Sequence, residues 1–443
     1  MRGVRCAAAV VLALTSSAAV AQESRVAADL RREAEDIQSS CSGFDAKAIV
    51  GCVVTLATDD PFHVAIGSLA PKNGTAFGLA FAEHSTPNDR WRIGWNADAV
   101  AATSGSWRAG AYAKLVYRPP TPIVVVRPGT TPPPGTTPRV TITEYPVVNV
   151  YAQAISLDTL EIEAGRDPFS ERQTIVGTNV IYPVAKAGAL RLAIVGAVNG
   201  RWLSVRDKTT GGSQQPAFAQ FEEGVRLRPS FNERFRLNYL VDFQQFATGA
   251  DASFHRWTLD LKHELPLYGS TPSTGPKDTN GPDECFQSAG SSRCPPVSYS
   301  RDLEGSVAFR VLATTSIASA GSSVPFYFQP TLGGSDINGQ RLLAAYDDYS
   351  FRGPNLVAFQ ESIEHSIWGP LGAYVLAEQG KVTQAAEGLG FDGLLHSFGV
   401  GLTIRAGGFP LVNLTFAWGG GGHHLLGTID ATLLGGSARP SLF

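Results

Sequence analysis

The sequence predicts an all-β protein, a transmembrane β-barrel of sixteen antiparallel strands, and three observations support this. The N-terminus has the features of a secretory signal. After it, no run of about 18 apolar residues could form a transmembrane helix. Most of the chain beyond position 75 alternates between apolar and polar residues. Such a period of two indicates strands with one face in apolar surroundings and the other in water.

The signal is read from the first residues. Arg2 and Arg5 give a positive start, residues 7–14 are apolar, and residues 19–21 read Ala-Val-Ala, which fits the cleavage rule. We therefore expect residues 1–21 to be a signal peptide and Gln22 to begin the mature protein. Loss of the two arginines would change the formal net charge from −3 to −5, which gives no indication of nucleic-acid binding.

Residues 22–63 are expected to be a short periplasmic segment ahead of the barrel. The four cysteines that follow the signal fall into two close pairs, Cys41 with Cys52 and Cys285 with Cys294. In an oxidising periplasm these pairs predict two local disulfides. No Cys-x-x-Cys, His-Glu-x-x-His or phosphate-binding loop occurs, so we expect neither a metal nor another cofactor.

The alternation is clearest in residues 107–118. Trp107 and Tyr117 share one face with small apolar residues, whereas Arg108 and Lys114 lie on the other. Since strands must close on themselves in lipid to pair every backbone group, alternating segments of this length favour a barrel over a soluble sandwich. The pattern predicts sixteen strands, at 75–85, 89–103, 106–118, 145–155, 157–165, 173–183, 188–199, 214–228, 232–247, 252–267, 300–314, 355–367, 370–382, 394–406, 409–419 and 422–433.

With this assignment the barrel spans residues 64–435 and a C-terminal tail covers 436–443. An even number of strands places both ends of the barrel on the periplasmic side. Counting strands from there puts residues 119–144, 200–213 and 315–354 outside the cell, and residues 268–299 in the periplasm. The Pro-rich composition of 119–144 predicts a stiff, extended loop.

The last third of the chain carries six short aromatic or glycine motifs in a fixed order. They lie at residues 325–336, 349–355, 367–371, 378–382, 397–402 and 416–419. Together they resemble the bacterial surface-antigen superfamily, the barrels similar to BamA and TamA. The earlier strands match this family in rhythm only. The resemblance implies a location in the bacterial outer membrane, in contact with its lipid.

The resemblance also implies that the long extracellular loop 315–354 folds back into the lumen. The family's loop motif corresponds here to Gly333, Gly334, Phe351 and Gly353. In the family, an arginine at the loop tip meets acidic residues of the barrel wall. Here Ala344 and Ala345 stand before the tip tyrosine, so the nearest arginines are Arg341 and Arg352.

The expected partners of these arginines are carboxylates, because a cation in a narrow lumen requires one. The candidates are Glu378, Glu361 and Glu364. The alternative is that all of these charges are solvated lumen residues.

For function, the resemblance implies a role in outer-membrane protein or lipid assembly or transport. The chain has no room for the periplasmic POTRA domains that many relatives carry, so a separate POTRA or lipoprotein partner would have to supply them. The first alternative is a passive porin with a mixed-charge lumen. The second is a lipid hydrolase, but the Gly-x-Ser-x-Gly elbow is absent, so we expect no enzyme.

Overall fold

The computed structural model describes residues 62–88, 90–118, 145–187, 190–229, 235–249, 252–270, 303–319, 322–368, 371–406, 409–429 and 439–442. The predicted signal peptide, most of the predicted N-terminal segment and all four paired cysteines lie outside these residues. In the described part, no helix is long and apolar enough to span a membrane.

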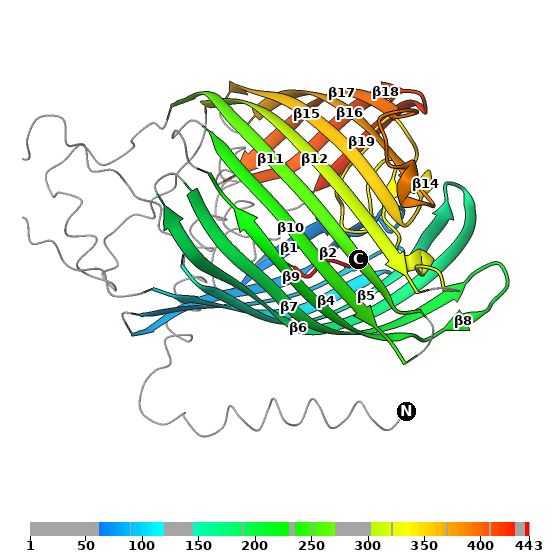
Figure 1. Cartoon of the computed structure of the whole chain (residues 1–443). Helices are drawn as coiled ribbons and strands as arrows, with labels where there is room; N and C mark the ends of the chain where they lie inside the picture. Colours follow the sequence, from blue (N-terminus) through cyan, green and yellow to red (C-terminus); the bar gives the residue numbers. More distant parts are fainter. Residues whose placement is uncertain are drawn as a thin grey trace, which may run out of the picture.

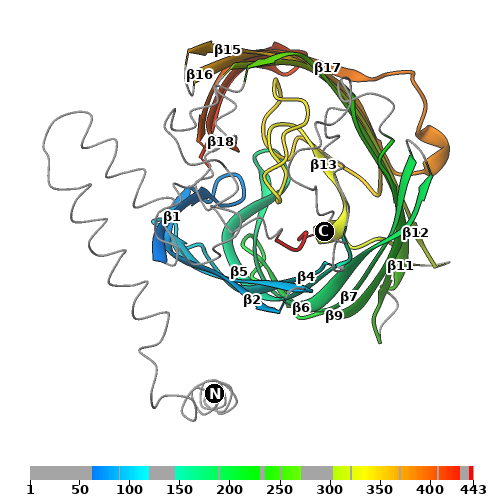
Figure 2. The ribbon, with the colours of Figure 1, turned by 90° about the vertical axis from the view of Figure 1, so that its left-hand side faces the viewer.

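Sixteen long strands follow one another around a barrel, and each is antiparallel to the next (Figures 1 and 2). The predicted sixteen-stranded antiparallel fold is therefore confirmed. The strands are β1 (Phe62–Ser68), β2 (Thr75–Asn88), β3 (Trp91–Ala102), β4 (Trp107–Tyr117), β5 (Val147–Glu163), β6 (Arg166–Ala187), β7 (Leu190–Asp207), β9 (Ala217–Leu227), β10 (Arg236–Ala247), β11 (Phe254–Ser270), β12 (Leu303–Ala318), β15 (Asn355–Trp368), β16 (Leu371–Thr383), β17 (Leu395–Ala406), β18 (Phe409–Gly419) and β19 (Gly422–Ile429).

Five short elements lie in the connections. They are β8 (Ser213–Gln214), the 3-10 helix η1 (Phe326–Phe328), β13 (Thr331–Leu332), β14 (Phe351–Arg352) and the 3-10 helix η2 (Ala386–Gly388). β8 adds two residues to the edge of β7, and β13 pairs with β14 in a small separate sheet. Because β12 continues to Ala318, the long loop begins at 319, four residues later than the sequence predicts.

The two faces of the barrel wall follow the predicted alternation. On β4, Trp107 is 40% exposed and points outward, whereas its neighbour Arg108 is 9% exposed and points inward. On β10, Val241 is 43% exposed and Asp242 only 3%. Large apolar side chains are exposed in the same way on strands all around the barrel, as a bilayer requires.

The N-terminal part differs from the prediction in two ways that cancel in the strand count. The first strand, β1, precedes the expected start at 75, and the segments 145–155 and 157–165 form one strand, β5. A register shift interrupts β5 between Leu157 and Leu160, and both leucines are buried at 1% exposure. This bulge breaks the period of two, which is why the sequence pattern suggested two strands.

These differences change the end of the barrel to which one predicted loop, residues 119–144, is assigned. The ends of β4 and β5 that flank residues 119–144 lie at the same end of the barrel as the start of β1. Residues 319–354 connect strands at the opposite end, so the two segments do not share a side. The flanking strands of 271–302 are at the end where β1 starts, as the parity predicted.

The barrel has a seam between its first and last strands. β1 pairs with β2, and β19 pairs with β18. β1 and β19 approach each other, but no backbone pairing joins them within the described residues. The connection that follows β1 makes further contacts that help to fix the position of this strand.

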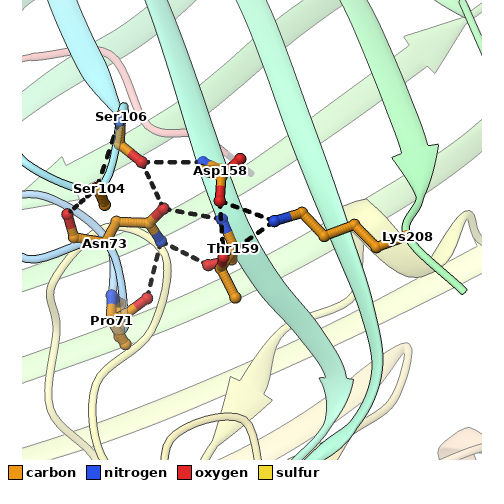
Figure 3. Close-up of polar contacts among 7 residues, drawn as sticks. All are labelled: Pro71, Asn73, Ser104, Ser106, Asp158, Thr159 and Lys208. Atoms are coloured by element: carbon orange, nitrogen blue, oxygen red, sulfur yellow. Dashed lines mark hydrogen bonds and ion pairs between the residues drawn. The ribbon is translucent and has the colours of Figure 1, made fainter.

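A buried amide provides such contacts at the end of β1 (Figure 3). Asn73 follows β1 in the connection to β2 and is completely buried. Its Nδ2 donates to the carbonyl oxygens of Pro71, at 2.9 Å, and Thr159, at 2.6 Å. Its Oδ1 accepts from Ser106 Oγ at 2.7 Å and Thr159 N at 3.0 Å. The amide thus ties the β1–β2 connection to the β3–β4 turn and to β5.

The same cluster continues outward to the β7–β9 connection. Ser106 Oγ accepts from the backbone N–H of Asp158 at 2.9 Å, and Lys208 Nζ donates to Asp158 Oδ2 at 2.7 Å (Figure 3). Asp158 and Thr159 are the bulged residues of β5. The bulge turns their backbone toward Asn73, so this irregularity creates the binding site for the amide.

Asn73→Ala should lower the free energy of unfolding by about 2–4 kcal/mol, since four side-chain hydrogen bonds are lost and their buried partners stay unpaired. Urea unfolding in detergent or lipid, followed by tryptophan fluorescence, would measure it. The matched control is Asn88→Ala in the β2–β3 turn, where the exposed amide accepts two turn N–H groups. We expect about 1 kcal/mol or less there, and equal losses would contradict the anchoring role.

Candidate functional site

The long loop between β12 and β15 lies inside the ring of strands (Figure 2). Its described part, residues 322–354, is here called the lumen loop. At its tip the backbone N–H of Ala344 donates to Glu378 Oε2 of β16 at 2.7 Å, and that of Ala345 donates to Ser397 Oγ of β17 at 2.9 Å. Glu378 is 1% exposed, and its Oε1 accepts from Gln360 Nε2 at 2.9 Å. Main-chain groups of the tip therefore reach the wall carboxylate.

The two candidate arginines have other partners. Arg341 donates to the hydroxyls of Thr415 and Thr428, on β18 and β19. Arg352 donates to the carbonyl oxygens of Glu161 at 2.9 Å and Ile162 at 3.1 Å, both on β5. It also donates to Phe326 O, within the loop, at 2.7 Å. Among the described residues neither guanidinium forms an ion pair with the predicted glutamates.

The other two candidate glutamates lie away from the tip. Glu361 is exposed and shares its face of β15 with Ile363, which is 54% exposed, so Glu361 points out of the barrel. This corrects the expectation that it faces the lumen, and the period of two along a strand is the reason. Glu364 lies on the inward face, but near the far end of β15, beside Gly372.

The loop motif forms the internal frame of the lumen loop. Gly333 and Gly334 have φ angles of +103° and +61°, and Gly334 N donates to Leu343 O at 3.2 Å. A Cβ on Gly334 would lie 2.1 Å from Asp348 Oδ1, which accepts from Ser335 N. Glycine is thus needed for both backbone angle and space. Phe351 packs edge-on against Tyr346 at 5.2 Å, and Gly353 N donates to Pro330 O at 3.3 Å.

Burial also sets the charges in this frame. It raises the pKa of the Asp348 carboxyl, although the hydrogen bond from Ser335 N opposes the shift. It raises the pKa of Tyr349 well above its ordinary value, so this buried ring stays neutral.

The glycine run 419–422 receives the tip of the lumen loop. A Cβ on Gly420 would lie 2.3 Å from Tyr346 Oη, and one on Gly421 would lie 2.4 Å from Ala345 O. The turn between β18 and β19 must therefore lack side chains where Tyr346 passes. The sequence showed the run but gave no indication of its partner.

An aromatic cluster anchors the other end of the loop. Phe328 of η1 is fully buried, and its ring centroid lies 4.9–5.6 Å from those of Phe218, Phe246 and Phe254, which point inward from β9, β10 and β11. Arg256 of β11 donates to Phe328 O and to Ser316 Oγ and lies over the Phe246 ring at 5.4 Å. The lumen loop therefore spans the barrel from β15–β19 to β5 and β9–β11.

A cavity of about 710 Å³ remains beside the lumen loop. The ends of β1 and β19, inward residues of β4 and β5, the loop turn 335–340 and residues 439–442 line it. Asp98 Oδ2 lies nearby, 3.1 Å from Arg108 and 3.2 Å from Arg439. The cavity thus lies next to the seam, in a polar part of the lumen, and is of the size of ligand sites in proteins.

Comparison with solved structures places this geometry among known barrels. CdiB from Acinetobacter baumannii aligns with a TM-score of 0.50 and 11% identity over 83% of this chain and 58% of its own. BamA from Haemophilus ducreyi lacking POTRA domains 1-3 aligns with a TM-score of 0.50 and 10% identity over 84% of this chain and 69% of its own. CdiB from Escherichia coli aligns with a TM-score of 0.52 and 10% identity over 84% of this chain and 62% of its own.

These likenesses show a shared barrel fold, so the fold expected from the resemblance to BamA-like barrels is confirmed. The chain spans 58% of the length of the Acinetobacter CdiB. No protein-family profile matches the sequence, and no curated protein matches it significantly.

Glu378→Ala should loosen the tip of the lumen loop, because the buried N–H of Ala344 loses its acceptor at a cost of about 1–3 kcal/mol. Local opening would then increase roughly 5- to 150-fold. Hydrogen exchange at Ala344 or protease cleavage within 335–347 would measure it. Glu361→Ala, on the outward face of the neighbouring strand, is the matched control and should leave both rates unchanged.

Proposed function

We propose that this chain, which has the barrel fold of CdiB and BamA, is an outer-membrane barrel of the assembly or transport type whose resting lumen is closed by the lumen loop. The observation that supports this proposal is the pair of attachments that hold the loop across the lumen. The tip binds β16 and β17 through Glu378 and Ser397, and Phe328 binds the wall at β9–β11. A passive pore would not need contacts that hold a loop across its lumen from one side of the wall to the other.

The seam supports the same proposal. β19 forms one side of it, and Arg341 of the lumen loop is bound to Thr415 of β18 and Thr428 of β19. Movement of the loop would therefore act directly on β18 and β19. A barrel that can alter its last strands is suited to passing substrates or inserting them, whereas a fixed ring is suited to diffusion.

The end of the barrel opposite the lumen loop is proposed to bind a separate periplasmic protein that carries POTRA domains or a lipid anchor. Turns such as that between β2 and β3 are at the end of the barrel away from the lumen loop. A partner that delivers substrate from the periplasm would contact this end.

Shortening the lumen loop should open the pore. Ser335 N lies 2.9 Å from Asp348 Oδ1, so a three-residue glycine linker can replace residues 336–347. In planar bilayers we expect a small conductance for the native protein and a several-fold larger one for the variant. The same linker in place of 209–212, in the exposed β7–β9 connection, is the control and should change nothing. A large, steady conductance of the native protein would contradict this proposal and favour the porin.

The proposed partner can be tested by photo-crosslinking in cells. A photoreactive residue at the exposed position Arg90, in the β2–β3 turn, should form an adduct with a POTRA-bearing protein or a lipoprotein. The same residue at Thr210, exposed at the opposite end, should not. Absence of any such adduct from Arg90 would argue against a partner at this end.

A further inference from the structure

Residues 439–442, here called the tail segment, lie inside the barrel, between the wall and the lumen loop (Figure 2). The sequence predicts only a short tail after the last strand. In the structure, the backbone of this segment is bound from both sides. Leu442 N donates to Asn338 Oδ1 of the lumen loop at 2.7 Å. Ser441 O accepts from Arg201 Nη2 of β7 at 2.8 Å, and Leu442 O accepts from Gln173 Nε2 of β6 at 3.3 Å.

The side chains of the segment are bound as well. Leu442 is 5% exposed and belongs to the buried apolar cluster that contains Ile155, Leu203 and Ile337. Arg439 donates to Asp98 Oδ2 of β3 at 3.2 Å. Asn338 Nδ2 donates to Ser441 Oγ at 3.3 Å, so this single amide contacts both 441 and 442.

The groups that bind the tail segment are themselves held in place. Arg201 is 1% exposed, and its Nε donates to Gln220 Oε1 at 2.6 Å. Gln173 is 1% exposed on β6. Asp98 is 4% exposed and is also bound by Arg108 at 3.1 Å. Buried polar groups on rigid strands that converge on one stretch of main chain are the features of a preformed binding site.

We propose that the lumen contains a binding site for an extended peptide, which the tail segment fills in the resting protein. The contacts define what the site recognises. Arg201, Gln173 and Asn338 bind main-chain atoms, which any sequence supplies. Asp98 and the apolar cluster select a basic residue three positions before an aliphatic one. The adjoining cavity of about 710 Å³ provides space into which a competing peptide could enter.

This site joins the wall to the lumen loop, because Asn338 belongs to the loop and Arg201 and Gln173 belong to the wall. A peptide that displaced the tail segment would therefore remove one attachment of the loop turn 335–340. The proposal concerns peptide binding alone and does not depend on the proposed transport role.

The first test uses the unmodified protein. In hydrogen-exchange mass spectrometry, the amide of Leu442 should exchange at least 100-fold more slowly in the folded barrel than in the unfolded chain. Asn338→Ala removes its acceptor and should raise that rate about tenfold or more. Exchange at the unfolded rate in the native protein would overturn the proposal.

The second test measures binding in trans. Leu442→Asp, in the full-length protein, places a carboxylate in the apolar site and should release the tail segment. A fluorescent peptide of residues 436–443 should then bind saturably, and at least tenfold more tightly than to the native protein, whose tethered segment competes at an effective concentration of about millimolar. A peptide with aspartate in place of leucine should not bind.

The matched control is Phe391→Asp, which makes the same kind of change at a side chain that is 79% exposed in the β16–β17 connection. It should bind no more peptide than the native protein. Heat-modifiable gel migration would establish that each variant has folded. A folded Leu442→Asp barrel that fails to bind the peptide would refute the proposal. Should that variant not fold, Arg439→Glu replaces it in the binding assay, because it breaks the contact with Asp98 from the tail segment and leaves the groups of the site unchanged; the expected and contradicting outcomes are the same.

Discussion

Strand-to-strand backbone pairing is the constraint on which the rest of this structure depends. Lipid offers no partner for an N–H or a carbonyl group, so each strand must find its partners in its neighbours. Consecutive pairing from β1 to β19 meets this requirement between neighbouring strands and sends alternate side chains into an enclosed space. Consecutive pairing therefore creates both the enclosed lumen and the seam where the first and last strands meet.

The interior is held together mainly by wall side chains that bind main-chain atoms of segments inside it. Glu378 binds the N–H of Ala344, Arg256 binds Phe328 O and Arg201 binds Ser441 O. Such contacts require a main chain of the right course and are largely independent of the side chains it bears. This explains how the loop tip can carry Ala344 and Ala345 where the resemblance to BamA-like barrels implies an arginine.

The likeness to CdiB and BamA concerns the barrel, at 10–11% identity. The segments that lie inside the lumen distinguish a gated barrel from a passive porin. Here a loop attached at two ends and a bound tail segment lie inside it, and a cavity next to the seam remains beside them. These features are consistent with a gated barrel and with the proposed peptide site.

The sequence alone determined the fold class, most strands and the face of most side chains, because a strand's period of two is a local property. It also located the loop motif: Gly334 adopts a positive φ angle that is also local. Only the tertiary structure decided the partners of Arg341 and Arg352, the side of residues 119–144 and the place of the tail segment. These depend on the bulge at Leu157–Leu160 and on residues hundreds of positions apart, such as Arg201 and Ser441, that meet only when the barrel closes.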